Sequence, residues 1–177
     1  MPDVSLMPER NPSYEIISLV DLYRLALFAQ EDREHLFAGE KNNHAWRKLY
    51  EGQLICTALC QGAALHYIKQ GDGIKDFDVW SFFARNPEVD LPPRRRSIRD
   101  FADPKFGKTP GYDHFTGRKV DFMMRSIDTY GLNDPEAILR HYLQNGQTES
   151  ARQLARKAVV LLEPDNLIGK VIWQPGS

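Results

Sequence analysis

The sequence predicts an α+β fold: a small mixed β-sheet with helices on one side. Helical periodicity near the start, short apolar stretches in the middle and capped helical patterns near the end favour this class. The 177 residues, 42% hydrophobic and 27% charged, suit one globular domain and lack a composition typical of disorder. We expect a single domain over 1–177, with an N-terminal helical part (1–50), a sheet core (51–127) and C-terminal helices (128–177).

The first half of the chain carries two helical patterns. Apolar residues between Ile16 and Phe28 recur at helical spacing and predict a helix that runs to about Phe37, capped by Ser18 or Ser13. A second, shorter helix is expected over 44–51.

The sequence pattern in the middle of the chain predicts β-strands. The stretch 54–60 is short, apolar and partly β-branched, which indicates a buried strand, and 63–69 follows as a short helix. Two further strands are expected over 74–83 and 119–127. The Pro- and Gly-rich connection 84–117 is too long to lack structure and predicts a short element at 97–101.

The C-terminal part of the chain is predicted to be helical. Asp134 and Pro135 form an N-cap and N1 pair for a helix that ends before Gly146. A further helix is expected over 148–162, because apolar residues recur there on one face.

Charge and cysteine content narrow the class of protein. There are 23 Lys plus Arg against 24 Asp plus Glu, a net charge of -1, so bulk attraction to nucleic acid or to a membrane surface has no support. No apolar run approaches the ~20 residues of a membrane span, and no secretory signal is visible. Cys56 and Cys60 lie too far apart on one strand to bridge, so we expect reduced core thiols in a cytoplasmic protein.

Two carboxylates on one strand are the strongest chemical signal. Asp76 and Asp78 stand at i and i+2, so they share a face of the strand, among apolar neighbours that indicate burial. Their repulsion requires bulk water, a proton or a cation between them, and oxygen ligands at this spacing suit Mg²⁺ or Mn²⁺. A solvent-facing edge strand with ordinary carboxylates is the structural alternative.

A third carboxylate, Asp121, lies inside the apolar stretch 119–127. A charge there is costly unless it is paired, with Arg118 or Arg125 as candidates, or bound to a metal. If the two strands are neighbours, three carboxylates converge as a two-metal phosphoryl-transfer site requires.

These residues resemble the signature of the nucleotidyltransferase superfamily with the DNA polymerase beta type fold. The likeness covers about residues 50–127: Gly62 at a strand-to-helix turn, then Asp76-Phe77-Asp78, then Asp121 on a later strand. The resemblance implies a nucleotidyltransferase-like fold in which Asp76, Asp78 and Asp121 are catalytic and bind two Mg²⁺ (or Mn²⁺) ions. It also implies a nucleoside triphosphate substrate whose nucleotidyl group passes to a hydroxyl acceptor.

The phosphates would be held by the backbone at Gly62 and Ala63, at the start of a helix. Ala63 departs from the family, which has Gly or Ser there, so a side-chain hydroxyl on the phosphate is missing. The basic run Arg94, Arg95 and Arg96, extended by Lys119, is a further candidate to grip a triphosphate or a nucleic-acid backbone.

Three functions follow from these observations. The first is a metal-dependent nucleotidyltransferase acting on an unidentified hydroxyl acceptor, as a monomer, a homodimer or with a protein partner. The second, favoured by Ala63, is a catalytically weak binding or regulatory protein of the same fold, such as an antitoxin-like partner or a nucleotide sensor. The third is a nucleic-acid-binding module that uses 94–99, which the neutral net charge disfavours.

Overall fold

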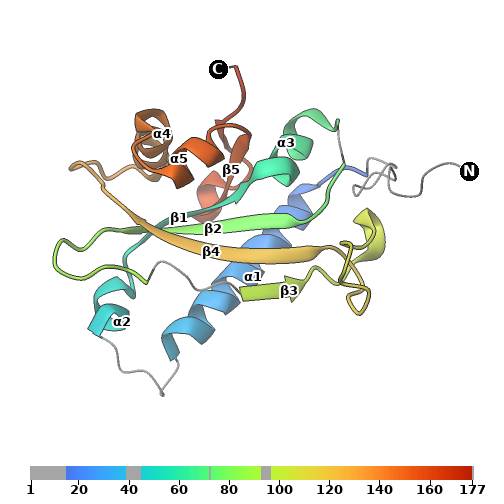
Figure 1. Ribbon diagram of the computed structural model, residues 1–177, viewed down its shortest axis with the longest axis horizontal. Helices are drawn as coiled ribbons and strands as arrows, with labels where there is room; N and C mark the ends of the chain where they lie inside the picture. The colour runs from blue at the N-terminus through green and yellow to red at the C-terminus, as the bar shows by residue number, and fades with distance from the viewer. Residues whose placement is uncertain (1–14, 39–44, 72, 93–96, 177) are drawn as a thin grey trace, which may run out of the picture.

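The computed structural model describes residues 15–38, 45–71, 73–92 and 97–176 and contains one mixed sheet flanked by helices (Figure 1). In chain order the elements are α1 (Leu19–Ala38), α2 (Ala45–Tyr50), β1 (Leu54–Cys60), α3 (Gln61–Lys69), β2 (Phe77–Ala84), β3 (Ser97–Asp100), the 3₁₀ turn η2 (Pro104–Phe106), β4 (Lys119–Ile127), α4 (Pro135–Asn145), α5 (Glu149–Leu154), β5 (Ala158–Glu163), the 3₁₀ turn η3 (Asp165–Leu167) and β6 (Val171–Trp173). The predicted α+β class and mixed sheet are confirmed.

The sheet has six strands in the order β3-β4-β2-β1-β5-β6. Strands β2 and β4 are parallel, and the other neighbouring pairs are antiparallel. A parallel pair needs a long crossover, which explains the long connection between these two strands. That connection contains β3, so the short element predicted at 97–101 is confirmed.

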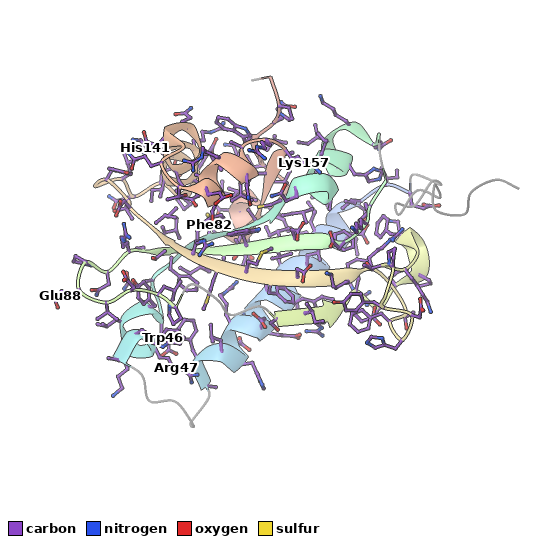
Figure 2. The ribbon with its side chains drawn as sticks, in the orientation of Figure 1. Trp46, Arg47, Phe82, Glu88, His141 and Lys157 are labelled. Atoms are coloured by element: carbon purple, nitrogen blue, oxygen red, sulfur yellow. The ribbon has the colours of Figure 1, made fainter. Side chains whose placement is uncertain are left out.

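Helices pack on both faces of the sheet, so the expectation of helices on one side is wrong. Helices α1 and α3 cover the face that carries Leu59 and Val79, whereas α4 and α5 cover the face of Ala58 and Phe82. Figure 2 shows Phe82 between the strands and the C-terminal helices. The central strands are apolar on both faces, and such strands require a cover on each side.

The helix predicted over 148–162 is wrong in its second half. The helix starts where it was expected, with Thr148 as its cap, whose Oγ1 accepts a hydrogen bond from the backbone of Ala151 (3.1 Å), but α5 ends at Leu154. Residues Ala158–Glu163 form β5 instead, which pairs with β1. The first five residues of β5 are all buried. A fully buried strand gives a continuous apolar run, which periodicity alone does not distinguish from a helix.

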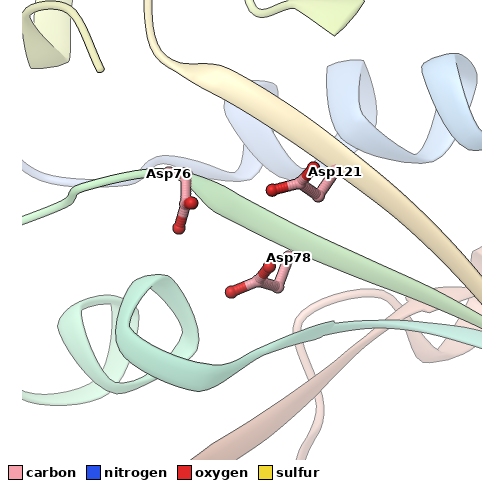
Figure 3. A group of neighbouring side chains, drawn as sticks. All are labelled: Asp76, Asp78 and Asp121. Atoms are coloured by element: carbon pink, nitrogen blue, oxygen red, sulfur yellow. The ribbon is translucent and has the colours of Figure 1, made fainter. Parts of the chain in front are cut away.

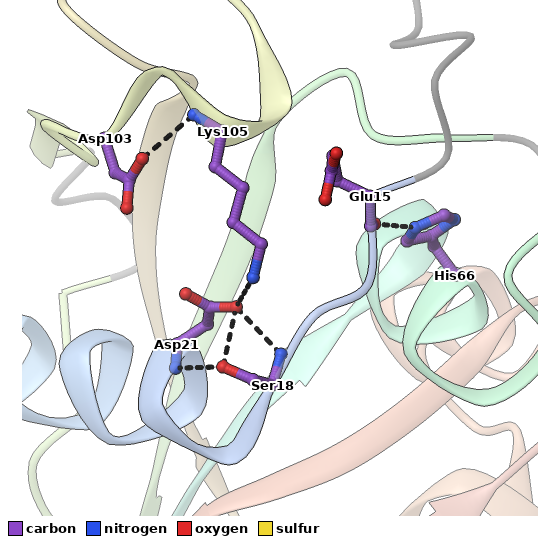
Figure 4. Close-up of polar contacts among 6 residues, drawn as sticks. All are labelled: Glu15, Ser18, Asp21, His66, Asp103 and Lys105. Atoms are coloured by element: carbon purple, nitrogen blue, oxygen red, sulfur yellow. Dashed lines mark hydrogen bonds and ion pairs between the residues drawn. The ribbon is translucent and has the colours of Figure 1, made fainter.

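The start of α1 is anchored to the rest of the fold by polar contacts (Figure 4). Ser18 caps the helix as predicted: its Oγ accepts from the backbone of Asp21, while Asp21 accepts from the Ser18 backbone (2.8 Å). Lys105, in η2, pairs with the Asp21 carboxylate at 2.9 Å. On the other side, His66 of α3 donates from Nε2 to the Glu15 carbonyl (2.7 Å). These contacts link α1 to the segment that precedes β4 and to the helix that follows β1.

Candidate metal centre

Three carboxylates converge on one face of the sheet, at the start of the parallel strands. Asp76, Asp78 and Asp121 each offer an oxygen atom, and these atoms lie within 4.8 Å of one another. Figure 3 shows the three side chains beside the ribbons of β2 and β4 and close to the helix α3. Among the described residues this is the one group of three or more potential metal ligands that meets this spacing.

The strand register explains the convergence. Asp78 in β2 lies directly opposite Asp121 in β4, and in a parallel pair such residues point to the same face. Asp76 stands just before β2, two residues from Asp78, and therefore lies on that face as well. The convergence of the three residues anticipated from the sequence is thus present.

The edge-strand alternative for Asp76 and Asp78 does not hold, whereas Asp121 does have a basic partner, as its structural alternative requires. Strand β2 lies between β4 and β1, so Asp76 and Asp78 are not on an edge strand. Asp121 is buried, with 2% of its surface exposed, and forms an ion pair with Lys119.

Two basic residues lie beside the carboxylates. Lys119 Nζ is 2.9 Å from Asp121 Oδ2 and 3.6 Å from Asp76 Oδ2. The neighbouring Arg118 is buried and donates to the backbone carbonyls of Phe106 (2.7 Å) and Lys108. Arg118 therefore fixes the loop that leads into β4, while Lys119 reaches the carboxylates.

The electrostatics of the two cations differ. Burial lowers the pKa of the Arg118 guanidinium, an effect that the Asp76 carboxylate opposes. Burial also acts to lower the pKa of Lys119, but the hydrogen bond to Asp121 and the charges of Asp121 and Asp76 outweigh it, so this pKa is raised. Lys119 is accordingly a fixed positive charge at neutral pH.

A cavity of about 410 Å³ opens beside Asp76 and Asp78. Gly62 and Ala63 line it at the start of α3, as the sequence resemblance implies. Other lining residues that sequence analysis did not single out are Gln61, Lys75, Trp80, Met123, Gln153 and Lys157. Gln61 could have been suspected because it adjoins the turn glycine, but Gln153 and Lys157 arrive through the fold and leave no local signal.

The start of α3 faces this cavity without a side-chain cap. The N-cap residue is Cys60, whose side chain makes no capping hydrogen bond. The backbone N–H groups of a first helical turn lack intrahelical partners and attract anions. The turn is also strained, because Gln61 adopts a φ of 63°, a left-handed conformation that disfavours side chains with a Cβ.

A larger cavity, about 540 Å³, lies at the opposite end of β2 and β4. Its lining includes Arg85, Tyr130, Tyr142 and Asn145 and none of the three clustered carboxylates. We place the candidate site in the smaller cavity, because the chemistry of the ligands rather than the volume decides what a site can do.

The predictions for the arginine run and for the two cysteines have different outcomes. Arg94, Arg95 and Arg96 lie outside the described residues. Cys56 and Cys60 are buried, unbridged thiols, as predicted. Burial, together with the charge of Glu163, raises the pKa of Cys56 to about 12, and burial followed by the charge of Asp78 raises that of Cys60.

Comparison with family models, with curated proteins and with solved structures gives no match to this chain. Within the described residues, no helix combines the length and the apolar character needed to cross a membrane.

Proposed function

We propose that this protein is a metal-dependent nucleotidyltransferase whose site is the cluster of Asp76, Asp78 and Asp121. The observation that carries the proposal is the approach of the three carboxylate oxygens to within 4.8 Å on one face of a sheet. Carboxylate oxygens are the ligands that Mg²⁺ and Mn²⁺ prefer, so the donor set fits either ion. A bound divalent cation would supply charge neutralisation for a phosphate substrate.

The arrangement around the cluster supports this assignment over a purely structural role. Strand β1 leads directly into α3, whose uncapped start, with Gln61 and Gly62, lines the same cavity as Asp76 and Asp78. A polyphosphate lying in that cavity would accept hydrogen bonds from the first turn of α3 and meet the carboxylates through the cation.

In the proposed reaction, the oxygen of an acceptor hydroxyl attacks the α-phosphorus of a nucleoside triphosphate in line with the leaving group. A new bond forms between that oxygen and the α-phosphorus, and the bond from the α-phosphorus to the bridging oxygen breaks, releasing pyrophosphate. A carboxylate of the cluster takes up the hydroxyl proton.

Ala63 favours a second candidate function, a catalytically weak nucleotide-binding or regulatory protein. Ala63 is 2% exposed and its side chain belongs to the core beneath α3. Only its backbone N–H group could therefore contact a phosphate. Binding through backbone N–H groups alone is compatible with a sensor that holds nucleotide without turning it over.

A thermal-shift titration separates these functions. Wild type is titrated with MgCl₂ and each nucleoside triphosphate, alongside Asp76→Asn/Asp78→Asn and the surface control Asp165→Asn. The proposal expects a Mg²⁺-dependent rise in melting temperature for wild type and the control, and none for the double variant. Pyrophosphate release then distinguishes the transferase from the sensor. The absence of a shift with every nucleotide would refute both functions.

A further inference from the structure

Lys119 occupies one end of the carboxylate cluster. It is the first residue of β4 and stands two positions before Asp121, on the same face of the strand. Its ammonium group lies 2.9 Å from Asp121 and 3.6 Å from Asp76, so one cation already bridges two of the three carboxylates.

The surroundings hold this ammonium group in place. The Lys119 side chain is only 9% exposed, and its Nζ lies 5.0 Å from the centre of the Tyr112 ring, a cation–π contact. The backbone N–H of Lys119 donates to Thr109 Oγ1 (2.9 Å), and that hydroxyl donates to the carbonyl of Lys75 (2.6 Å). The loop before β4 and the segment before β2 therefore fix the start of the strand from which Lys119 reaches the carboxylates.

The charge balance of the cluster follows from this position. Within the cluster, the charges of three carboxylates and the Lys119 ammonium group sum to −2, which one divalent cation neutralises. The Arg118 guanidinium, which interacts with the charge of Asp76, adds positive charge beside it. A second divalent cation between Asp76 and Asp121 would lie close to the ammonium group. The two would repel each other twice as strongly as two single positive charges at the same distance. Two divalent cations and Lys119 therefore compete for the same ligands.

We propose that Lys119 takes the place of one of two divalent cations, so that the cluster itself binds a single Mg²⁺ or Mn²⁺ ion. This inference rests on the proposed function and changes the metal count that the sequence resemblance implies from two to one. In this arrangement Lys119 is a positioning residue: its ammonium group, 2.9 Å from Asp121 and 3.6 Å from Asp76, supplies the positive charge that a second ion would bring only when bound.

The test is the number of Mn²⁺ ions bound per chain, measured without nucleotide. Electron paramagnetic resonance of free Mn²⁺ and isothermal titration calorimetry count the ions at saturation for wild type, Lys119→Met, Lys119→Gln and Lys119→Arg. A matched control, Lys157→Met, removes a positive charge from the same cavity. Circular dichroism and the melting temperature verify that each variant is folded.

We expect one ion for wild type, Lys119→Arg and Lys157→Met, and two ions for Lys119→Met and Lys119→Gln. Glutamine keeps a polar group at the site, so it provides the measurement if the apolar methionine prevents folding. Two ions in wild type, or one ion in every folded Lys119 variant, would overturn the inference while leaving the proposed metal-dependent function intact. No ion in wild type and in all variants would overturn both.

Discussion

Replacing Asp78 with asparagine is expected to stabilise the metal-free protein and to remove its response to Mg²⁺. The change keeps the shape of the side chain and deletes one charge from a cluster whose oxygen atoms lie within 4.8 Å of one another. If a carboxylate has a functional role here, it is retained in spite of its cost to stability, and relieving the repulsion reveals that cost.

The magnitude follows from Coulomb's law. Two unit charges about 5 Å apart at an effective dielectric constant of about 40 interact by about 1.7 kcal/mol. Asp78 faces two such repulsions, from Asp76 and Asp121, which together come to about 3 kcal/mol before screening by solvent. With the discount due to partial exposure, we expect a gain of about 1–2 kcal/mol, or about 2–8 °C in melting temperature for a chain of this length.

The assay is thermal unfolding of wild type and Asp78→Asn, first in EDTA and then with increasing MgCl₂. A ligand that binds only the folded state stabilises it by about 2.7 kcal/mol at a hundredfold excess over its Kd. The variant should therefore melt above wild type in EDTA and at or below it in saturating Mg²⁺, whereas Asp165→Asn, on the surface, should follow wild type throughout.

Two results would refute this reasoning. A variant that melts below wild type in EDTA would mean that Asp78 stabilises the fold, as a structural carboxylate does. An equal rise with Mg²⁺ in both proteins would mean that the cation binds elsewhere.

Four further changes test the local structure by urea unfolding. Gln61→Gly should raise the free energy of unfolding by about 1 kcal/mol, because glycine relieves the left-handed strain at φ 63°; a loss would argue against that strain. Arg118→Met should lower it by about 3 kcal/mol or more, because buried backbone carbonyls lose their donor, and a neutral result would contradict the role of Arg118 in fixing the loop. Thr148→Ala should cost about 1 kcal/mol through the lost cap of α5, unless that short helix adds nothing to stability. Burial acts to raise the pKa of Asp100, but three backbone N–H hydrogen bonds lower it on balance. The carboxylate therefore stabilises the fold above the unfolded-state pKa of about 3.9, and this stabilisation is lost as the pH falls through the folded-state pKa. The loss of unfolding free energy in Asp100→Ala should shrink between pH 7 and pH 3, and a constant loss would contradict this linkage.

The local signals in the sequence predicted most of the elements. The caps predicted at Ser18 and Asp134 are present in the structure, because a cap is a contact between residues three positions apart. The strand of residues 54–60 was likewise predicted with the bounds of β1.

The prediction failed where burial on both faces removes periodicity. The first five residues of Ala158–Glu163 form a continuous apolar run, and only the pairing of this segment with β1 and β6 makes it a strand. The same property of the central strands places helices on both faces of the sheet rather than on one. Neither result is encoded in the spacing of apolar residues within a single segment.

For the candidate site, the sequence by itself determined which residues carry charge inside apolar strands: the pair Asp76 and Asp78, and Asp121 some forty residues later. Only the tertiary structure decided that β2 and β4 are parallel neighbours in the register that sets Asp78 opposite Asp121. It also decided that Lys119 pairs with Asp121. The physical reason is that the free-energy cost of burying a carboxylate can be inferred from the apolar residues next to it in the sequence. Its partner, in contrast, depends on strand register, which is set by the packing of the whole sheet.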